Sequence, residues 1–173
     1  VGGLSELLAA SIHGSPDVDI AVPNGTYTLQ LLLYEGWQSR SADIVIEGKT
    51  IKEKYNQLKE QGGNFNHGSV LRHTFTLTDG NIDIEIKALT ETNIHLGGLI
   101  LSKGNGGDTV STAVVKNKSD LDFKDVLKVI NFGDTRNLSV GDVTFTAAAV
   151  NTTVDGVTNK ASGDVYAGEH NQK

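Results

Sequence analysis

The clearest pattern along the chain is the alternation of apolar and polar residues over short segments. Residues 70–78 alternate and are followed by Asp79-Gly80, after which residues 81–87 alternate again with an isoleucine at every second position. An alternation of period two is typical of strands that bury one face, and Asp-Gly favours a tight hairpin turn. We therefore predict two strands that pair as a β-hairpin, with Ile82, Ile84 and Ile86 directed inward.

Other short segments have the composition of strands. They are residues 27–33, 43–47, 93–101, 129–132 and 140–146. The first of these places Tyr27 and three leucines on one face, and the second runs into a turn at Gly48-Lys49. Within residues 93–101, Gly97-Gly98 interrupts an apolar run, which indicates a bulge or a close approach of another backbone.

Two segments contain good helix formers, residues 4–10 and residues 50–60, and Gly62-Gly63 would end the second. Either segment can instead be irregular. Residues 104–120 are rich in small polar residues, a composition typical of a linker. Together the patterns predict an all-β fold, a jelly-roll-like antiparallel β-sandwich with one or two short helices.

Length and composition limit the classes of function. A chain of 173 residues without cysteine is most simply one domain that folds without disulfides. Its net charge of −6 and its 15 scattered Lys and Arg residues argue against a nucleic-acid partner, and no apolar run is long enough to span a bilayer. The sequence begins at Val1 and contains no methionine, so we expect a segment of a longer protein.

Several motifs together resemble the malectin-type carbohydrate-binding domain. They are Pro23-Asn-Gly-Thr-Tyr27, the Leu-rich strand ending in Glu35, Asp43-Ile-Val-Ile-Glu-Gly48, the Asp79-Gly80 turn and Gly98-Leu-Ile-Leu101. The resemblance covers roughly half of the chain, residues 22–101. It implies a jelly-roll-like sandwich that binds an oligosaccharide or polysaccharide.

The order of the segments differs from that of the family. The opening strand of such domains resembles Val129-Ile-Asn-Phe-Gly-Asp134, which here follows the closing strand. We interpret residues 1–103 as the central and closing strands, 104–127 as a linker-like joint, and 128–173 as the opening strands of one circularly permuted domain. The alternatives are a cut across tandem repeats and a naturally permuted branch. Permutation predicts that Val1 and Lys173 lie close together.

The resemblance also implies candidate ligand-binding residues. Trp37 and Gln38 fall at positions where the family carries sugar contacts, and Arg40 adds a hydrogen-bonding group beside the only tryptophan. Flat aromatic rings and planar polar groups are suited to the faces and hydroxyls of sugars. Tyr166 matches a second aromatic residue that contacts the sugar in the family. Asn93 stands where the family has an acidic residue, and this difference puts the family's usual disaccharide specificity in doubt for this chain.

Other polar residues receive structural interpretations beside functional ones. Glu35 and Asp43 are expected to cap backbone amides at strand ends. Of the five dispersed histidines, His67 is the candidate for facing a ligand, although a solvated loop position is the preferred explanation. We expect no cofactor. The spacings Asp17-Val-Asp19 and Asp120-Leu-Asp122 would suit a structural calcium ion, but solvated carboxylates explain them.

Three functions are consistent with these observations. The first is a non-catalytic, monomeric carbohydrate-binding module of a secreted or cell-surface bacterial protein. The second is a structural or adhesive repeat without affinity for sugar, and an engineered permutant used as a scaffold fits either. The third, a hydrolase, would require two carboxylates about 5–9 Å apart across a cleft. No hydrolase signature accompanies the carboxylates of this sequence, so we predict that the protein is not an enzyme.

Overall fold

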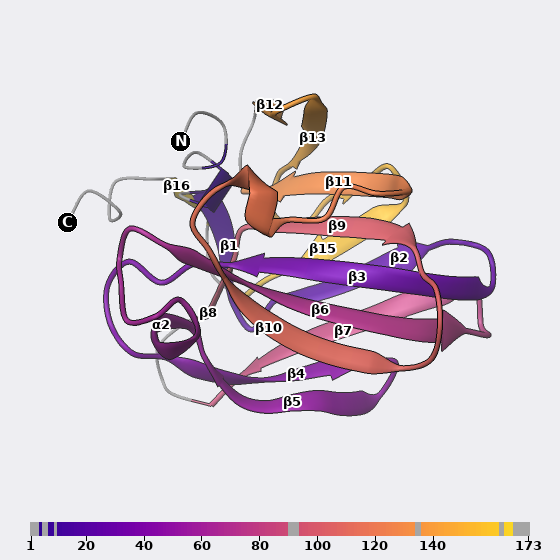
Figure 1. Cartoon of the computed structure of the whole chain (residues 1–173), viewed down its shortest axis with the longest axis horizontal. Coiled ribbons are helices and arrows are strands. Elements are labelled where there is room, and N and C mark those ends of the chain that lie inside the picture. Colours follow the sequence, from indigo (N-terminus) through magenta and orange to yellow (C-terminus); the bar gives the residue numbers. More distant parts are fainter. Residues whose placement is uncertain are drawn as a thin grey trace.

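The computed structural model describes residues 4, 7, 8, 10–89, 94–133 and 136–162, together with the backbone of residues 165–167. The described chain is built almost entirely of β-strands, which confirms the predicted all-β class. One sheet of seven strands and one of six form two facing layers, and a sheet of three strands adjoins them (Figure 1).

The seven-stranded sheet has the order β10-β6-β3-β9-β11-β13-β12. Its strands are β3 (Gly25–Leu33), β6 (Gly68–Leu77), β9 (Gly98–Lys103), β10 (Thr109–Val115), β11 (Val126–Phe132), β12 (Leu138–Val140) and β13 (Val143–Ala148). All neighbours are antiparallel except β11 and β13, which are parallel.

The six-stranded sheet has the order β14-β15-β2-β7-β4-β5 and is antiparallel throughout. Its strands are β2 (Asp17–Ala21), β4 (Ser41–Ile46), β5 (Lys49–Asn56), β7 (Asn81–Ala88), β14 (Thr153–Val154) and β15 (Val157–Lys160). The third sheet, in the order β16-β1-β8, contains β1 (Ala10–Gly14), β8 (Ile94–Leu96) and β16 (Val165–Ala167). The short helices are α2 (Gln57–Glu60) and the 3-10 turn η1 (Lys118–Asp120).

The main core lies between the two large sheets. The inward residues of β3, among them Leu29 and Leu31, pack with Ile82, Ile84 and Ile86 of β7, all of them fully or almost fully buried. These are the residues that the alternating patterns placed inward, so the predicted faces of both strands are confirmed. Burial of these aliphatic side chains supplies the main driving force for the sandwich.

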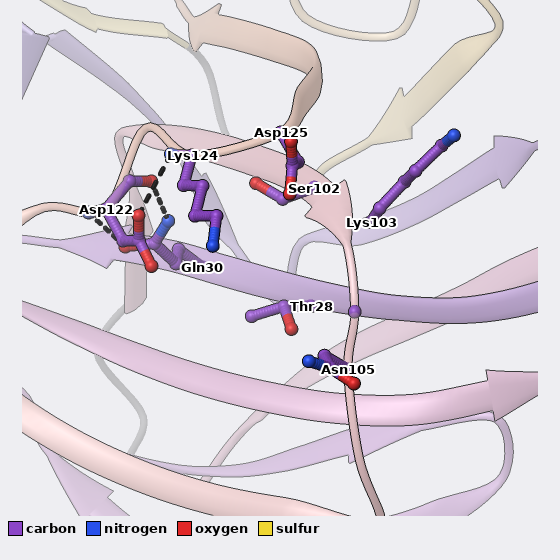
Figure 2. A pocket seen from close by; sticks show the side chains of 9 residues that line it. Thr28, Gln30, Ser102, Lys103, Asn105, Asp122, Lys124 and Asp125 are labelled. Carbon is purple, nitrogen blue, oxygen red and sulfur yellow. Dashed lines mark hydrogen bonds between the residues drawn. The ribbon is translucent and has the colours of Figure 1, made fainter.

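A second apolar cluster covers part of the opposite, outer face of the seven-stranded sheet. Leu32, Val70 and Ile100 point to this face and are covered by Leu4, Leu7, Leu8 and Leu121, among others. The helical conformation at residues 4, 7 and 8 agrees with the helical interpretation of residues 4–10, although Ala10 already belongs to β1. Further along β3, the outer face carries Thr28 and Gln30 instead, and there a polar pocket opens (Figure 2).

The predicted hairpin at Asp79-Gly80 is wrong, because β6 and β7 belong to different sheets. β6 pairs with β3 over nine residues, whereas β7 lies between β2 and β4. The turn crosses from one layer to the other, and Asn24 Oδ1 holds it by accepting a hydrogen bond from Gly80 N at 2.8 Å. A turn dipeptide favours a reversal of direction but does not decide which strands pair.

Three other segments also differ from expectation. Most of residues 50–60 form strand β5 instead of a helix, and only Gln57–Glu60 is helical. The stretch 104–127, expected as a linker-like joint, contains β10 and η1, and β10 pairs with β6 over seven residues. Residues 140–146, expected as one strand, divide between β12 and β13, which are joined at Gly141 and Asp142.

The prediction of a close backbone approach at Gly97-Gly98 is confirmed. A Cβ added at Gly97 would lie 3.1 Å from the carbonyl oxygen of Leu7, and one added at Gly98 would lie 3.1 Å from that of Ile130. These contacts are tighter than most side chains have, so a Cβ at either position would require the neighbouring backbone to shift.

Strands from the two ends of the sequence are neighbours. β1 pairs antiparallel with β16, with Ala10 opposite Ala167, and β11 pairs with β9. Val1 and Lys173, whose proximity the permutation hypothesis predicts, lie outside the described residues. Among the helices that are described, none has the length and apolar character required to cross a membrane.

Candidate functional site

The segment from Tyr34 to Arg40, here called the Trp37 loop, begins where β3 leaves the sheet. Glu35 organises it, although its side chain is only 1% exposed. Its Oε2 atom accepts hydrogen bonds from the backbone N–H of Trp37 at 2.9 Å and of Gln38 at 3.0 Å. This is the capping role predicted for Glu35, and the bonds fix the backbone on which the indole is carried.

The other carboxylate oxygen of Glu35 faces a cation. Arg40 Nε lies 3.3 Å from Glu35 Oε1, in an ion pair whose two side chains are 12% and 1% exposed. Burial raises the pKa of Glu35, while the Gln38 amide, Arg40 and the Trp37 amide act in the opposite direction. The carboxylate is thus held in place by several donors but is desolvated enough to be protonated more readily than an exposed glutamate.

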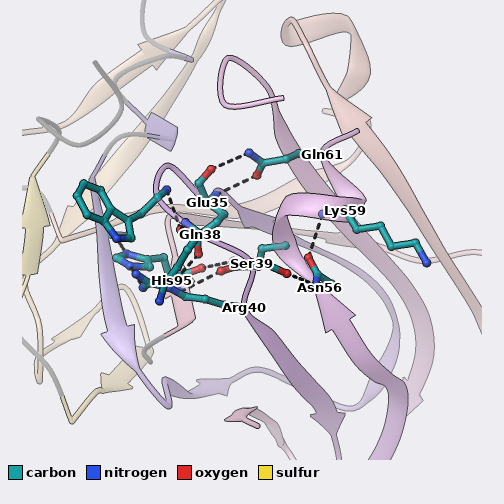
Figure 3. Close-up of polar contacts among 11 residues, drawn as sticks. Glu35, Gln38, Ser39, Arg40, Asn56, Lys59, Gln61 and His95 are labelled. Carbon is teal, nitrogen blue, oxygen red and sulfur yellow. Dashed lines mark hydrogen bonds and ion pairs between the residues drawn. The ribbon is translucent and has the colours of Figure 1, made fainter. Parts of the chain in front are cut away.

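Arg40 connects the loop to the three-stranded sheet through His95 of β8. Arg40 Nη1 is 2.9 Å from His95 Nε2, and His95 Nδ1 is 2.8 Å from Ser11 Oγ of β1 (Figure 3). Because the guanidinium only donates, Nε2 must accept, which assigns the proton of a neutral His95 to Nδ1, where it is donated to Ser11. The ring of His13 stacks on that of His95 with centroids 5.4 Å apart.

Two glutamines support this network from helix α2 and its end. Gln61 donates from Nε2 to the carbonyl of Glu35 at 2.7 Å and accepts from the Glu35 N–H at 2.9 Å (Figure 3). Its side-chain amide thus makes the pair of hydrogen bonds that the backbone of a neighbouring strand would make. Gln57 Nε2 donates to the carbonyl of His95 at 2.7 Å. Both glutamine side chains are fully buried, and their hydrogen bonds to the backbone help to fix the geometry of the network.

The predicted ligand-binding residues differ in their exposure to solvent and in their contacts. Trp37 is 55% exposed, Gln38 is half-buried beside it, and Arg40 is committed to the Glu35–His95 network. His67 is half-buried in the loop after Gln61, which is tied to the Trp37 loop because Tyr34 Oη donates to the carbonyl of Phe65 at 2.7 Å. The Trp37 and His67 loops are therefore neighbours.

The remaining two candidates are less defined. Tyr166 lies in β16, and its backbone pairs with Ser11 of β1, the residue whose hydroxyl contacts His95. The side chain of Tyr166 is not among those described. Asn93 lies outside the described residues.

Asp43 also binds a backbone amide, since its Oδ1 atom accepts from the N–H of Lys54 at 2.9 Å, where β5 bulges; it does so from within β4 rather than from the expected strand end. Asp120 has a similar role in η1, accepting from the N–H groups of Lys116 and Asn117, and these bonds lower its pKa. Among the described residues there is no group of three or more His, Cys, Asp or Glu side chains suited to a metal ion.

Sequence reasoning missed Ser11, Gln57, Gln61 and the role of His95. The spacing of Gln57 and Gln61, four residues apart, was an available signal, because one helical turn brings such residues to the same side. The partner of His95 comes from a distant strand and left no local pattern. Searches against protein-family models, curated proteins and solved structures found no match to this chain.

Proposed function

We propose that the protein is a non-catalytic carbohydrate-binding module whose main contact is Trp37. The observation that carries the proposal is the combination of an exposed indole and a fixed backbone. The only tryptophan of the chain is more than half exposed, yet the two N–H groups around it are held by a buried carboxylate.

This combination suits the recognition of sugars. The C–H faces of a pyranose pack on flat aromatic rings, and a contact residue whose backbone is already fixed loses less conformational entropy on binding. Gln38 and His67 lie on the two adjoining loops and can donate to or accept from hydroxyl groups at the edge of a bound ring. Arg40, by contrast, acts as a support, because its guanidinium is engaged with Glu35 and His95.

Malectin-like ancestry, a circularly permuted order and an extracellular or cell-surface location belong to the same proposal. Its support is the set of motifs in residues 22–101 and the confirmed capping role of Glu35. A permuted domain also needs its first and last strands to be neighbours, as β1 and β16 are. A structural or adhesive repeat is the alternative, and the binding experiment below decides between them.

The test is a glycan-array screen followed by fluorescence titration. Because Trp37 is the only tryptophan, its emission reports directly on ligand binding at this loop. Trp37→Ala lacks this emission, so its affinity is compared with that of the parent protein by isothermal titration calorimetry; we expect binding at least tenfold weaker, with an unchanged far-UV circular dichroism spectrum. Val110→Ala, at another exposed apolar residue, is the matched control and should bind normally. A folded parent protein that binds no glycan would refute the proposal and favour the structural repeat.

A further inference from the structure

The outer face of the seven-stranded sheet changes character along β3. At one end Leu32 is covered by the second apolar cluster, whereas at the other Thr28 and Gln30 lie at the surface of a pocket of about 400 Å³. Its remaining lining comes from Ser102 and Lys103 of β9, the following Gly104-Asn105, and Asp122, Lys124 and Asp125 (Figure 2). A volume of this size lies within the range of small-molecule sites, ~300–1,000 Å³.

The floor of the pocket contains one polar group that the protein leaves unsatisfied. Thr28 Oγ1 is bonded to Thr74 Oγ1 at 2.7 Å, and Gln30 bonds the backbone of Asp122 with both ends of its amide, at 2.6 and 3.1 Å. The hydroxyl of Ser102, however, has no hydrogen-bond partner among the described residues, although Ser102 is only 5% exposed. Buried hydroxyls are normally paired, so this one keeps an unused hydrogen-bonding capacity beside the pocket.

The walls carry charges of both signs in equal number. Lys103 and Lys124 line the pocket together with Asp122 and Asp125, and the amide of Asn105 also belongs to the lining. Two carboxylates would repel a polyanion and two ammonium groups a polycation, and the lining contains no aromatic or aliphatic side chain to attract an apolar molecule. The ligand that such walls favour is uncharged and rich in hydroxyl groups, each able to donate to a carboxylate and accept from an ammonium or amide.

We infer that this pocket is a second saccharide-binding subsite, which takes one uncharged sugar unit and supplies the Ser102 hydroxyl with its partner. The inference rests on the proposed carbohydrate-binding function. It assigns that function a second location, displaced along β3 from the Trp37 loop and independent of its indole. A chain of sugar units bound at both places would gain affinity through multivalency.

The test is a ¹⁵N–¹H NMR titration with uncharged mono- and disaccharides: glucose, galactose, mannose, N-acetylglucosamine, maltose and cellobiose. We expect at least one to shift the Gln30 side-chain amide and the Ser102 and Asn105 signals in a saturable manner. Ser102→Ala should weaken that binding at least fivefold while remaining as stable as the parent, because the hydroxyl has no partner to lose. Ser111→Ala, at an exposed serine of β10 outside the pocket, is the matched control.

Trp37→Ala separates the two sites. Shifts at Gln30 and Ser102 that persist in Trp37→Ala and disappear in Ser102→Ala would establish the subsite. Shifts confined to the Trp37 loop would overturn the subsite and leave the proposed function intact, and no shift with any sugar would overturn both. Pocket shifts produced only by glucuronate or by glycine would overturn the assignment to an uncharged ligand.

Discussion

Removal of the Glu35 carboxylate is the most demanding test of how the Trp37 loop is held. In Glu35→Ala, the guanidinium of Arg40 loses its ion pair with the Glu35 carboxylate, and the amides of Trp37 and Gln38 lose their acceptor. Removing one member of a buried ion pair costs about 3–5 kcal/mol, because a desolvated charge remains. Arg40 retains its contact with His95, and water can reach the loop amides, so we expect about 3–4 kcal/mol.

The cost is large compared with the total stability of a domain, about 5–15 kcal/mol. For a chain of this length it corresponds to a fall in Tm of about 6–16 °C. Glu35→Gln keeps an oxygen for the two amides but loses the ion pair, and it should cost about 1.5–3 kcal/mol, the value of a charge-assisted hydrogen bond. Glu53→Ala, at an exposed glutamate of β5, is the control and should change stability by less than about 0.5 kcal/mol.

Guanidinium denaturation followed by two probes measures these costs. Far-UV circular dichroism reports the sheets, and the fluorescence of Trp37 reports the loop. Coincident transitions shifted by the expected amount mean that the loop unfolds with the sandwich. An earlier fluorescence transition would mean that the loop opens separately. If Glu35→Ala lies within about 1 kcal/mol of the parent protein at equal m-value, the carboxylate does not hold the loop and the reasoning is refuted.

Three further predictions concern pH, backbone packing and chain order. Burial and then the charges of Asp19, Glu85 and Asp79 raise the pKa of Asp83 above its ordinary value of 3.8, so the folded protein binds this proton more tightly than the unfolded chain. Stability should therefore fall as pH rises through the range just above 3.8; Asp83→Asn should flatten that slope and, at pH 7, increase stability by less than about 1 kcal/mol, which thermal melts across pH would detect. Gly104→Ala would place a Cβ 2.6 Å from the backbone carbon of Tyr27 and should cost about 1–3 kcal/mol in denaturant melts, whereas Gly107→Ala, with no atom within 4 Å, should be neutral; equal effects would contradict the packing argument. A permutant opened within residues 105–108, with its present ends joined by a short Gly-Ser linker, should give the parent circular dichroism spectrum, since β1 and β16 are paired; loss of cooperative melting would count against the permutation hypothesis.

Much of the local structure follows from the sequence alone. Alternation in β3 and β7 fixed which side chains are buried, because successive residues of a strand point to opposite faces whatever the strand pairs with. The same pattern contained the change from Thr28 and Gln30 to Leu32, which decides where the outer face is open and where it is covered. Glu35 caps the amides of Trp37 and Gln38, an interaction between residues close in the chain, and it too was predictable, whereas the amide that Asp43 binds lies on the neighbouring strand β5.

Strand pairing and the supporting network required the tertiary structure. Asp79-Gly80 gives a turn in either a hairpin or a crossing between layers, and the choice depends on β3 and β2, the distant strands that occupy the edges of β6 and β7. Likewise, the contact of Arg40 with His95 joins residues 55 positions apart, and the unsatisfied hydroxyl of Ser102 becomes evident only once its neighbours are placed. Local patterns indicate which face of its own strand a residue occupies. Strand pairing and hydrogen-bond partners depend instead on residues that are distant in the sequence and meet only when the chain folds.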